Sequence, residues 1–158
     1  MMDSQALERI YREQVGRVYR LCCCYLKNRA DAEDVTQDAF VQLMRSGKRL
    51  EGTEHEKAWL LRTAANLCRN RLKHWSRRNA DIDTCVLPAP EEPADEVVQT
   101  VLGLPDRYKM TVFLYYYEGY PVKDIARMLR RPASTVRNHL SEARKMLKDL
   151  LEEQGYEE

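Results

Sequence analysis

The stretch "GYPVKDIARMLRRPASTVRNHLSEARKMLKDLL", residues 119–151, decides the fold of the C-terminal part of the chain. Its apolar residues recur at intervals of three and four, which is typical of helices. They predict a short helix over 122–129, a turn over 130–133 and a longer helix that ends near residue 151. This spacing is that of a helix-turn-helix motif, and the predicted inner faces consist of Ile125, Leu129, Val136, Leu140, Ala143 and Leu147.

The outward face of the second helix carries side chains suited to DNA, namely Ser134, Arg137, Asn138, Ser141 and Lys145. Arg and Asn read guanine and adenine edges in a major groove, and these two lie near the helix N-terminus, where a recognition helix meets the bases. A solvated helical hairpin would also carry charges at these positions. The turn and the basic balance of the segment together favour DNA binding.

The net charge of +1 over 158 residues conceals alternating basic and acidic blocks. Residues 1–80 carry +6, residues 81–100 carry −6, residues 101–151 carry +5 and the last seven residues carry −4. Two basic blocks separated by an acidic strip indicate two surfaces for a polyanion.

The acidic strip "DIDTCVLPAPEEPADE" has three prolines within six residues and no apolar period, so we place a linker there. On either side of it the apolar pattern is helical. The sequence therefore predicts an all-α fold with two small helical domains. These are an N-terminal bundle over 1–80, a flexible linker over 81–96, a helix-turn-helix domain over 97–151 and a frayed acidic tail over 152–158.

A long helix is predicted over 55–78, with one apolar stripe made by Ala58, Leu61, Ala64, Ala65, Cys68, Leu72 and Trp75. Its opposite side carries Trp59, Arg62, Thr63, Asn66, Asn70, Lys73 and Arg77. Cations can neutralise phosphates, Asn and Thr suit base edges, and a tryptophan can stack on an unpaired base. An ordinary solvated face with one tryptophan explains the same residues equally well.

Another helix is predicted to follow Asp31 as its N-cap and to stop at Gly47, with a core stripe of Ala32, Val35, Ala39 and Leu43. Its outer side combines apolar and acidic or polar residues, namely Asp34, Gln37, Asp38, Phe40, Val41 and Met44. Apolar residues ringed by carboxylates suit a protein partner better than DNA. Alternatively, Phe40 and Met44 widen the core contact of this helix.

The order of these segments is more specific than any one of them. "DAEDVTQDAFVQLM", "AWLLRTAANLCRNRLKHWSRR", the acidic linker and "LGLPDRYKMTVFLYYYEGYPVKDIARMLRRPASTVRNHLSEARKML" follow one another along the chain. This arrangement resembles a bacterial RNA polymerase sigma factor of the extracytoplasmic-function (ECF) class, from about residue 7 to residue 151. The resemblance implies a transcription initiation factor that binds core RNA polymerase, directs it to promoters and assists strand opening.

The resemblance also implies roles for individual residues. The clamp of the polymerase's largest subunit would be bound by Asp34, Gln37, Asp38, Phe40, Val41 and Met44. The minus-ten element would be read and its strands held apart by Trp59, Arg62, Thr63, Asn66, Arg69, Asn70, Lys73, Arg77 and Arg78. The minus-thirty-five element would be read by Ser134, Arg137, Asn138, Ser141, Glu142 and Lys145. The linker would follow the polymerase's active-site and RNA-exit channel, and the polymerase flap would be a second contact.

Three departures from the family pattern concern promoter reading. Arg130 stands where the family often has Gly, so the turn of the motif is expected to differ in shape. "LPDRYKM" places Arg107 or Lys109 near a usual Arg. Glu142 stands where an Arg is common, which exchanges a phosphate or base contact for a possible cytosine contact.

Other kinds of site find little support in the sequence. The consecutive Cys22, Cys23 and Cys24 diverge by about 100° each on a helix, so we interpret them as small buried residues and expect no metal. Neither a catalytic constellation nor a cofactor motif is present, so the chain is not expected to be an enzyme. Tyr115, Tyr116 and Tyr117 are expected to pack against the C-terminal helices.

With no apolar run of membrane length and no export signal, we expect a cytoplasmic protein that does not insert into membranes and is monomeric when free. An anti-sigma factor is common in the class and remains an open possibility. Two other classes stay open as well: a helix-turn-helix regulator that binds DNA without polymerase, and a protein-docking module without a DNA role.

Overall fold

The computed structural model describes residues 3–26, 28–47, 50–78 and 96–153, and it divides the chain into two compact units, Met1–Glu91 and Glu92–Glu158. Every regular element among these residues is a helix, which confirms the all-α prediction. The predicted linker lies outside the described residues, except for Glu96 at its end. None of the described helices is both long enough and apolar enough to cross a membrane.

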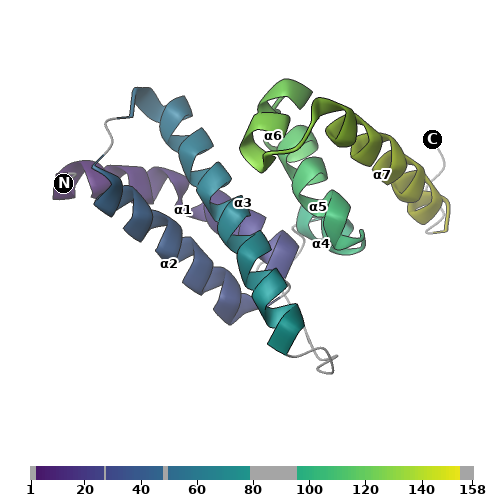
Figure 1. Ribbon diagram of the computed structural model, residues 1–158, viewed down its shortest axis with the longest axis horizontal. Helices are drawn as coiled ribbons and strands as arrows, with labels where there is room; N and C mark the ends of the chain where they lie inside the picture. Colours follow the sequence, from purple (N-terminus) through teal and green to yellow (C-terminus); the bar gives the residue numbers. More distant parts are fainter. Residues whose placement is uncertain (1–2, 27, 48–49, 79–95, 154–158) are drawn as a thin grey trace. The chain divides into compact units, whose positions relative to one another are not determined.

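Unit 1 is a bundle of three helices, α1 (Ser4–Leu26), α2 (Arg29–Ser46) and α3 (Gly52–Arg78), each of which packs against the other two (Figure 1). The predicted stripe of α2 is fully buried, and α3 buries Leu60 in addition to most of its predicted stripe. The core of the bundle consists mainly of Ile10, Val18, Leu21, Cys22, Ala32, Val35, Ala39, Leu43, Leu60, Leu61, Ala64, Ala65 and Cys68.

Helix α2 begins three residues earlier than predicted, because its N-cap is Asn28 and not Asp31. The side-chain oxygen of Asn28 accepts a hydrogen bond from the backbone N–H of Asp31 at 3.1 Å. Asn caps a helix as well as Asp does, and Asp31 then falls in the first turn, where its charge is favoured by the helix dipole. At the other end, Gly47 adopts φ 63°, so the predicted stop is confirmed.

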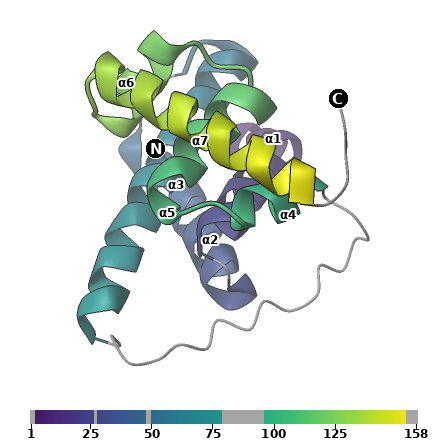
Figure 2. The same ribbon diagram turned by 90° about the vertical axis from the view of Figure 1, so that its right-hand side faces the viewer.

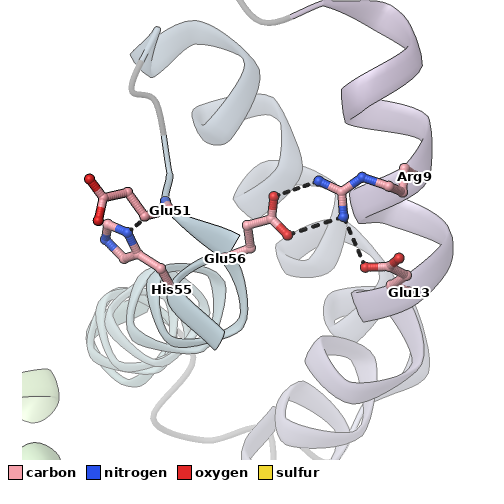
Figure 3. A network of polar contacts seen from close by, with 5 residues as sticks. All are labelled: Arg9, Glu13, Glu51, His55 and Glu56. Carbon is pink, nitrogen blue, oxygen red and sulfur yellow. Dashed lines mark hydrogen bonds and ion pairs between the residues drawn. The ribbon is translucent and has the colours of Figure 1, made fainter. Parts of the chain in front are cut away.

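Helix α3 begins at Gly52, three residues before the predicted start, and its first turns are held to α1 by a partly buried ion pair (Figure 3). Two nitrogens of the Arg9 guanidinium lie 3.3 and 2.7 Å from the two carboxylate oxygens of Glu56. Arg9 also pairs with Glu13 at 3.1 Å, on its own helix. The apolar pattern of α3 gives no indication of this contact, because Arg9 and Glu56 are both charged and do not contribute to that pattern.

Unit 2 contains α4 (Glu96–Leu102), α5 (Asp106–Val112), the π-helical turn η1 (Phe113–Tyr117), α6 (Val122–Leu129) and α7 (Ala133–Glu153) (Figure 2). Helix α6 has the predicted bounds, and α7 starts at Ala133, the last residue of the predicted turn, with Pro132 directly before it. Helices α5 and α6 both pack on α7. The core includes Val101, Leu104, Tyr108, Met110, Val112, Phe113, Leu114, Ile125, Leu129, Val136, Leu140 and Ala143.

The turn between α6 and α7 has the left-handed conformation that favours glycine, although its residue is Arg130. Arg130 adopts φ 55° and ψ 48°, and it is the one residue other than glycine with a positive φ in the described part of the chain. The next N–H, that of Arg131, donates to the carbonyl of Ala126 at 2.9 Å. The expectation of a different turn shape is therefore wrong, because the backbone of Arg130 adopts the left-handed conformation that a glycine usually supplies at this position.

Candidate nucleic-acid and partner interfaces

The predicted DNA-reading residues of α7 form one exposed stripe, which we call the α7 outer face. Its members, Ser134, Arg137, Asn138, Ser141 and Lys145, are all exposed, and they lie in the first two thirds of the helix. The opposite side of α7 is buried against the rest of unit 2 through Val136, Leu140 and Ala143. The helix therefore presents hydrogen-bonding and cationic side chains along a single direction.

Glu142, also predicted to contact DNA, is exposed but its carboxylate is engaged inside unit 2. The phenolic hydroxyl of Tyr108, on α5, donates a hydrogen bond to Glu142. On the other edge of α7, the Nε of Arg144 donates to the hydroxyl of Tyr116 from η1. Tyr116 is 52% exposed, and it meets α7 through Arg144, in agreement with the expectation that it packs against the C-terminal helices.

A chain of aromatic and cationic groups runs along the same edge of α7 as Glu142. The guanidinium carbon of Arg107 lies 4.7 Å from the centre of the Tyr108 ring, and the His139 ring meets Tyr108 edge-on at 5.3 Å. A guanidinium nitrogen of Arg131 lies 3.3 Å from Nδ1 of His139. Partial burial, followed by the charge of Arg131, lowers the pKa of His139 below its ordinary value.

None of the predicted minus-ten residues of α3 whose side chains the structure describes is buried, and we call these residues the α3 outer face: Trp59, Arg62, Thr63, Asn66, Arg69, Asn70 and Lys73. Asn70 and Lys73 are exposed, whereas Trp59, Arg62, Thr63, Asn66 and Arg69 are half-buried. The side chains of Arg77 and Arg78 lie outside the described residues, although both residues are helical. The face combines an aromatic ring, amides, a hydroxyl and cations, which is a suitable set for single-stranded nucleic acid.

Arg71 joins α3 to the acidic helix α2, and sequence reasoning did not single it out. One of its guanidinium nitrogens lies 3.5 Å from carboxylate oxygens of both Asp31 and Asp34. The same nitrogen donates to the backbone carbonyl of Asp31 at 3.4 Å. Asp34, a predicted polymerase contact, is therefore already partnered within unit 1.

The α2 residues predicted to bind a protein partner differ in exposure, and the burial of Phe40 agrees with the alternative that it widens the core contact of the helix. Asp34, Gln37 and Asp38 are exposed and Val41 and Met44 are half-buried; we call these residues the α2 outer face. Phe40 is only 5% exposed, because its ring packs edge-on against Tyr11 of α1 at 4.8 Å between centroids. Tyr11 itself is 37% exposed, and its hydroxyl accepts a hydrogen bond from Gln37 at 3.2 Å.

The cysteines that the structure describes are thiols within the bundle. Cys22, Cys24 and Cys68 are buried and Cys23 is half-buried, while Cys85 lies outside the described residues. Burial, and hydrogen bonding with Cys22, raise the pKa of Cys68 well above its ordinary value. Across the described residues, no three His, Cys, Asp or Glu side chains come together as a metal site.

Two family models match this chain, one over each unit. Residues 10–78 match sigma-70 region 2 and residues 94–147 match sigma-70 region 4. The chain belongs to the sigma-70 family of RNA polymerase initiation factors. Within that family it is a sigma factor of the ECF class, which binds core RNA polymerase and directs it to promoter DNA.

Its relatives include sigma factors from Pseudomonas aeruginosa and Haemophilus influenzae. The RNA polymerase sigma-H factor of Pseudomonas aeruginosa is 27% identical, with 95% of this chain and 88% of the relative covered. The ECF RNA polymerase sigma-E factor of Haemophilus influenzae is 28% identical, with 95% and 89% covered.

Among solved structures, the fold is similar to that of the sigma factor RpoE in complex with the anti-sigma factor NepR from Bartonella quintana. That match has a TM-score of 0.73 at 18% identity, and it covers 94% of this chain and 98% of the other.

Proposed function

We propose that the two units divide promoter recognition between them. Unit 2 reads the minus-thirty-five element through the α7 outer face. Unit 1 reads and captures the minus-ten element through the α3 outer face, together with Arg77 and Arg78, while the α2 outer face binds the largest-subunit clamp of the polymerase. This division goes beyond family membership, because it assigns each task to particular side chains.

The observation that carries the proposal is the separation of faces on α7. Each of its predicted DNA-reading residues is exposed, and each of its buried residues lies on the opposite side. A recognition helix needs this arrangement, because its outward side chains must reach base edges while its other side holds it to the domain. Arg137 and Asn138 are the two members suited to bidentate contacts with guanine and adenine.

Strand opening needs no chemistry from this chain. Extruding a base costs a few kcal/mol of stacking and pairing, and holding the freed base in a protein pocket offsets that cost. The half-buried Trp59, Thr63 and Asn66 on α3 supply a ring and two hydrogen-bonding groups for such a base. We therefore propose that the protein has no catalytic activity of its own and acts in the cytoplasm, where polymerase and promoter meet.

Two weak DNA-binding faces gain apparent affinity when the polymerase holds both at the spacing of the promoter elements. The chain without polymerase should consequently bind DNA weakly, with strong salt dependence and little sequence preference. An anti-sigma partner is a further part of the proposal, because the similar solved structure is of a sigma factor in complex with one.

The test is transcription of fragmented genomic DNA from the host by core RNA polymerase with and without the chain, followed by sequencing of transcript starts. Starts that require the chain and share two spaced elements would support the proposal. Asn66→Ala should then relax selection at the upstream part of the minus-ten element, and Arg137→Ala should relax it at the minus-thirty-five element.

Arg12→Ala is a matched control, because Arg12 is exposed on α1, pairs with Glu8 and belongs to none of the proposed faces. It should leave both elements unchanged. If no start depends on the chain and the chain alone binds a DNA site tightly, a helix-turn-helix regulator that works without polymerase becomes the better explanation.

A further inference from the structure

The edge of α7 next to Glu142 brings together two arginines and a histidine from three places in unit 2. Arg107 comes from α5, Arg131 from the turn before α7, and His139 from α7 itself. They are linked through the Tyr108 ring, since Arg107 lies over that ring and His139 packs against its edge. Arg131 reaches His139 directly, at 3.3 Å.

The balance of charge at this edge favours an anion. Arginine can only donate hydrogen bonds, so Nδ1 of His139 accepts from Arg131 and the imidazole is neutral. The charged and titratable groups that face the imidazole are Arg107, Tyr108, Arg131 and Glu142. Glu142 is the acid among them, and it already accepts a hydrogen bond from Tyr108.

We propose that Arg107, Arg131 and His139 form a binding site for a backbone phosphate of the DNA whose bases face α7. The inference rests on the proposed function of unit 2 and deepens it, because it adds a contact that fixes the position of the DNA and does not read its sequence.

DNA is the source of the phosphate because the site is continuous with the α7 outer face. His139 directly follows Asn138 in the helix, and Glu142 directly follows Ser141. A duplex whose base edges meet Asn138 and Ser141 has its sugar–phosphate backbone along the edge of the helix, where these cations lie.

Tyr108 is a positioning residue for this site. By hydrogen bonding to Glu142, it holds the carboxylate toward α5. Without the hydroxyl, a free carboxylate beside the site would repel the phosphate. Glu142 then contributes to DNA binding indirectly, in place of the cytosine contact that the sequence suggested.

The first experiment measures binding of the full chain to a fluorescein-labelled random-sequence duplex of about 30 base pairs by fluorescence anisotropy, from 50 to 200 mM NaCl. Each phosphate contact contributes about 0.9 to the slope of log affinity against log salt. Arg107→Gln and Arg131→Gln should each make the slope less steep by up to about 0.9. The affinity of the wild-type chain should then exceed that of the variant by a factor that is about three- to fourfold larger at 50 mM than at 200 mM salt.

The matched control is Arg12→Gln, which removes one exposed cation from α1 and should leave the slope unchanged. Tyr108→Phe should weaken binding, and adding Glu142→Gln to it should restore the affinity. If the affinity lost in Tyr108→Phe is not restored when Glu142→Gln is added, the positioning role of Tyr108 is contradicted.

The second experiment follows His139 by NMR in the full chain with and without the same duplex. Phosphate binding stabilises the imidazolium, so the pKa of His139 should rise when DNA is added, and affinity should increase as pH falls from 7.5 to 6. His139→Gln should remove that pH dependence.

Unchanged salt slopes in both arginine variants, together with an unshifted His139, would overturn the phosphate site. Those results would leave the proposed function intact if transcript starts still depend on the wild-type chain. Conversely, a chain that binds the duplex with the expected slopes but supports no promoter-selective starts would separate the phosphate site from a role with polymerase.

Discussion

Two nitrogens of Arg9 on α1 hold both carboxylate oxygens of Glu56 on α3, although Arg9 is 49% exposed and Glu56 only 4% (Figure 3). The two partners are therefore not equivalent. Removing the carboxylate leaves a guanidinium that still has water and Glu13, whereas removing the guanidinium leaves a buried carboxylate without its cation.

This asymmetry predicts that Arg9→Met destabilises unit 1 more than Glu56→Gln. The glutamine variant retains a hydrogen-bonding group and should cost about 1 kcal/mol. The measurement is urea unfolding followed by tryptophan fluorescence, which reports unit 1 because both tryptophans, Trp59 and Trp75, belong to α3. Equal losses in the two variants would show that the pair acts as a surface salt bridge.

Phe40 and Val41 are neighbours on α2 with different expected roles. Phe40→Ala should cost about 3 kcal/mol or more of unfolding free energy, because it empties a buried position against Tyr11. Val41→Ala should change stability much less and should instead weaken capture by core polymerase. Urea unfolding and a core-polymerase pull-down separate the two effects, and a stable Phe40→Ala variant that loses polymerase binding would restore Phe40 to the docking face.

Arg130→Gly should stabilise unit 2. The left-handed conformation costs an L-residue about 1–2 kcal/mol, and the greater freedom of glycine in the unfolded chain offsets about 0.4–1 kcal/mol of the gain. The expected net gain is about 0.5–1 kcal/mol, measured by native-state hydrogen exchange of buried amides in α6. Arg130→Val is the opposing variant and should destabilise the same amides, since a β-branched residue is poorly tolerated at this φ. A glycine variant that is no more stable would mean that the arginine side chain compensates for its backbone.

His139 gives unit 2 a pH-dependent stability. Because its pKa in the folded chain is lowered from the ordinary value of 6.5, the unfolded chain takes up a proton first as pH falls. Unit 2 should therefore lose stability as the pH falls through 6.5 and regain it at higher pH. Hydrogen exchange of the α6 amides at pH 5.5 and 7.5 measures the difference, and His139→Gln should reduce it whereas His55→Gln, in unit 1, should not. An identical pH dependence in His139→Gln would assign it to other groups.

The thiols of the bundle should differ in reactivity. Burial raises the pKa of Cys68 and also that of Cys23, so both are thiols and not thiolates at neutral pH. In the folded chain, iodoacetamide at pH 8 should modify Cys23 slowly and leave Cys22, Cys24 and Cys68 untouched, as read by peptide mass spectrometry. Labelling in urea is the reference, and Cys68 modified as fast in the folded chain as in urea would contradict its burial.

Amphipathic periodicity predicted most of the fold because it records which side of each helix is buried. It located α6 and the exposed side of α7 correctly, since the apolar and polar residues of those helices separate cleanly. It left the role of Phe40 open between a partner contact and the core, because the burial of Phe40 depends on Tyr11, a residue 29 positions away on another helix. A single helix does not reveal how much of its circumference its neighbours cover.

Contacts between charged groups were equally hidden from the sequence. Arg71 lies in a basic stretch of α3, and its pairing with Asp31 and Asp34 depends on how α2 and α3 pack against each other. Arg130 illustrates the converse, because its identity suggested an altered turn. The packing of the helices on either side of it fixes its backbone in the left-handed conformation, and the strain of that conformation is retained.

Glu142 and Arg144 are two positions apart on α7, so they point to nearly opposite edges of the helix, and each is bonded to a tyrosine hydroxyl from the α5–η1 segment. Rotating α7 about its own axis would stretch one bond or the other. The angle at which the helix presents Arg137 and Asn138 is thus set before DNA arrives. A helix that is already held at this angle loses less conformational entropy when DNA binds, and the smaller cost raises the affinity. Promoters can therefore be selected with few direct contacts.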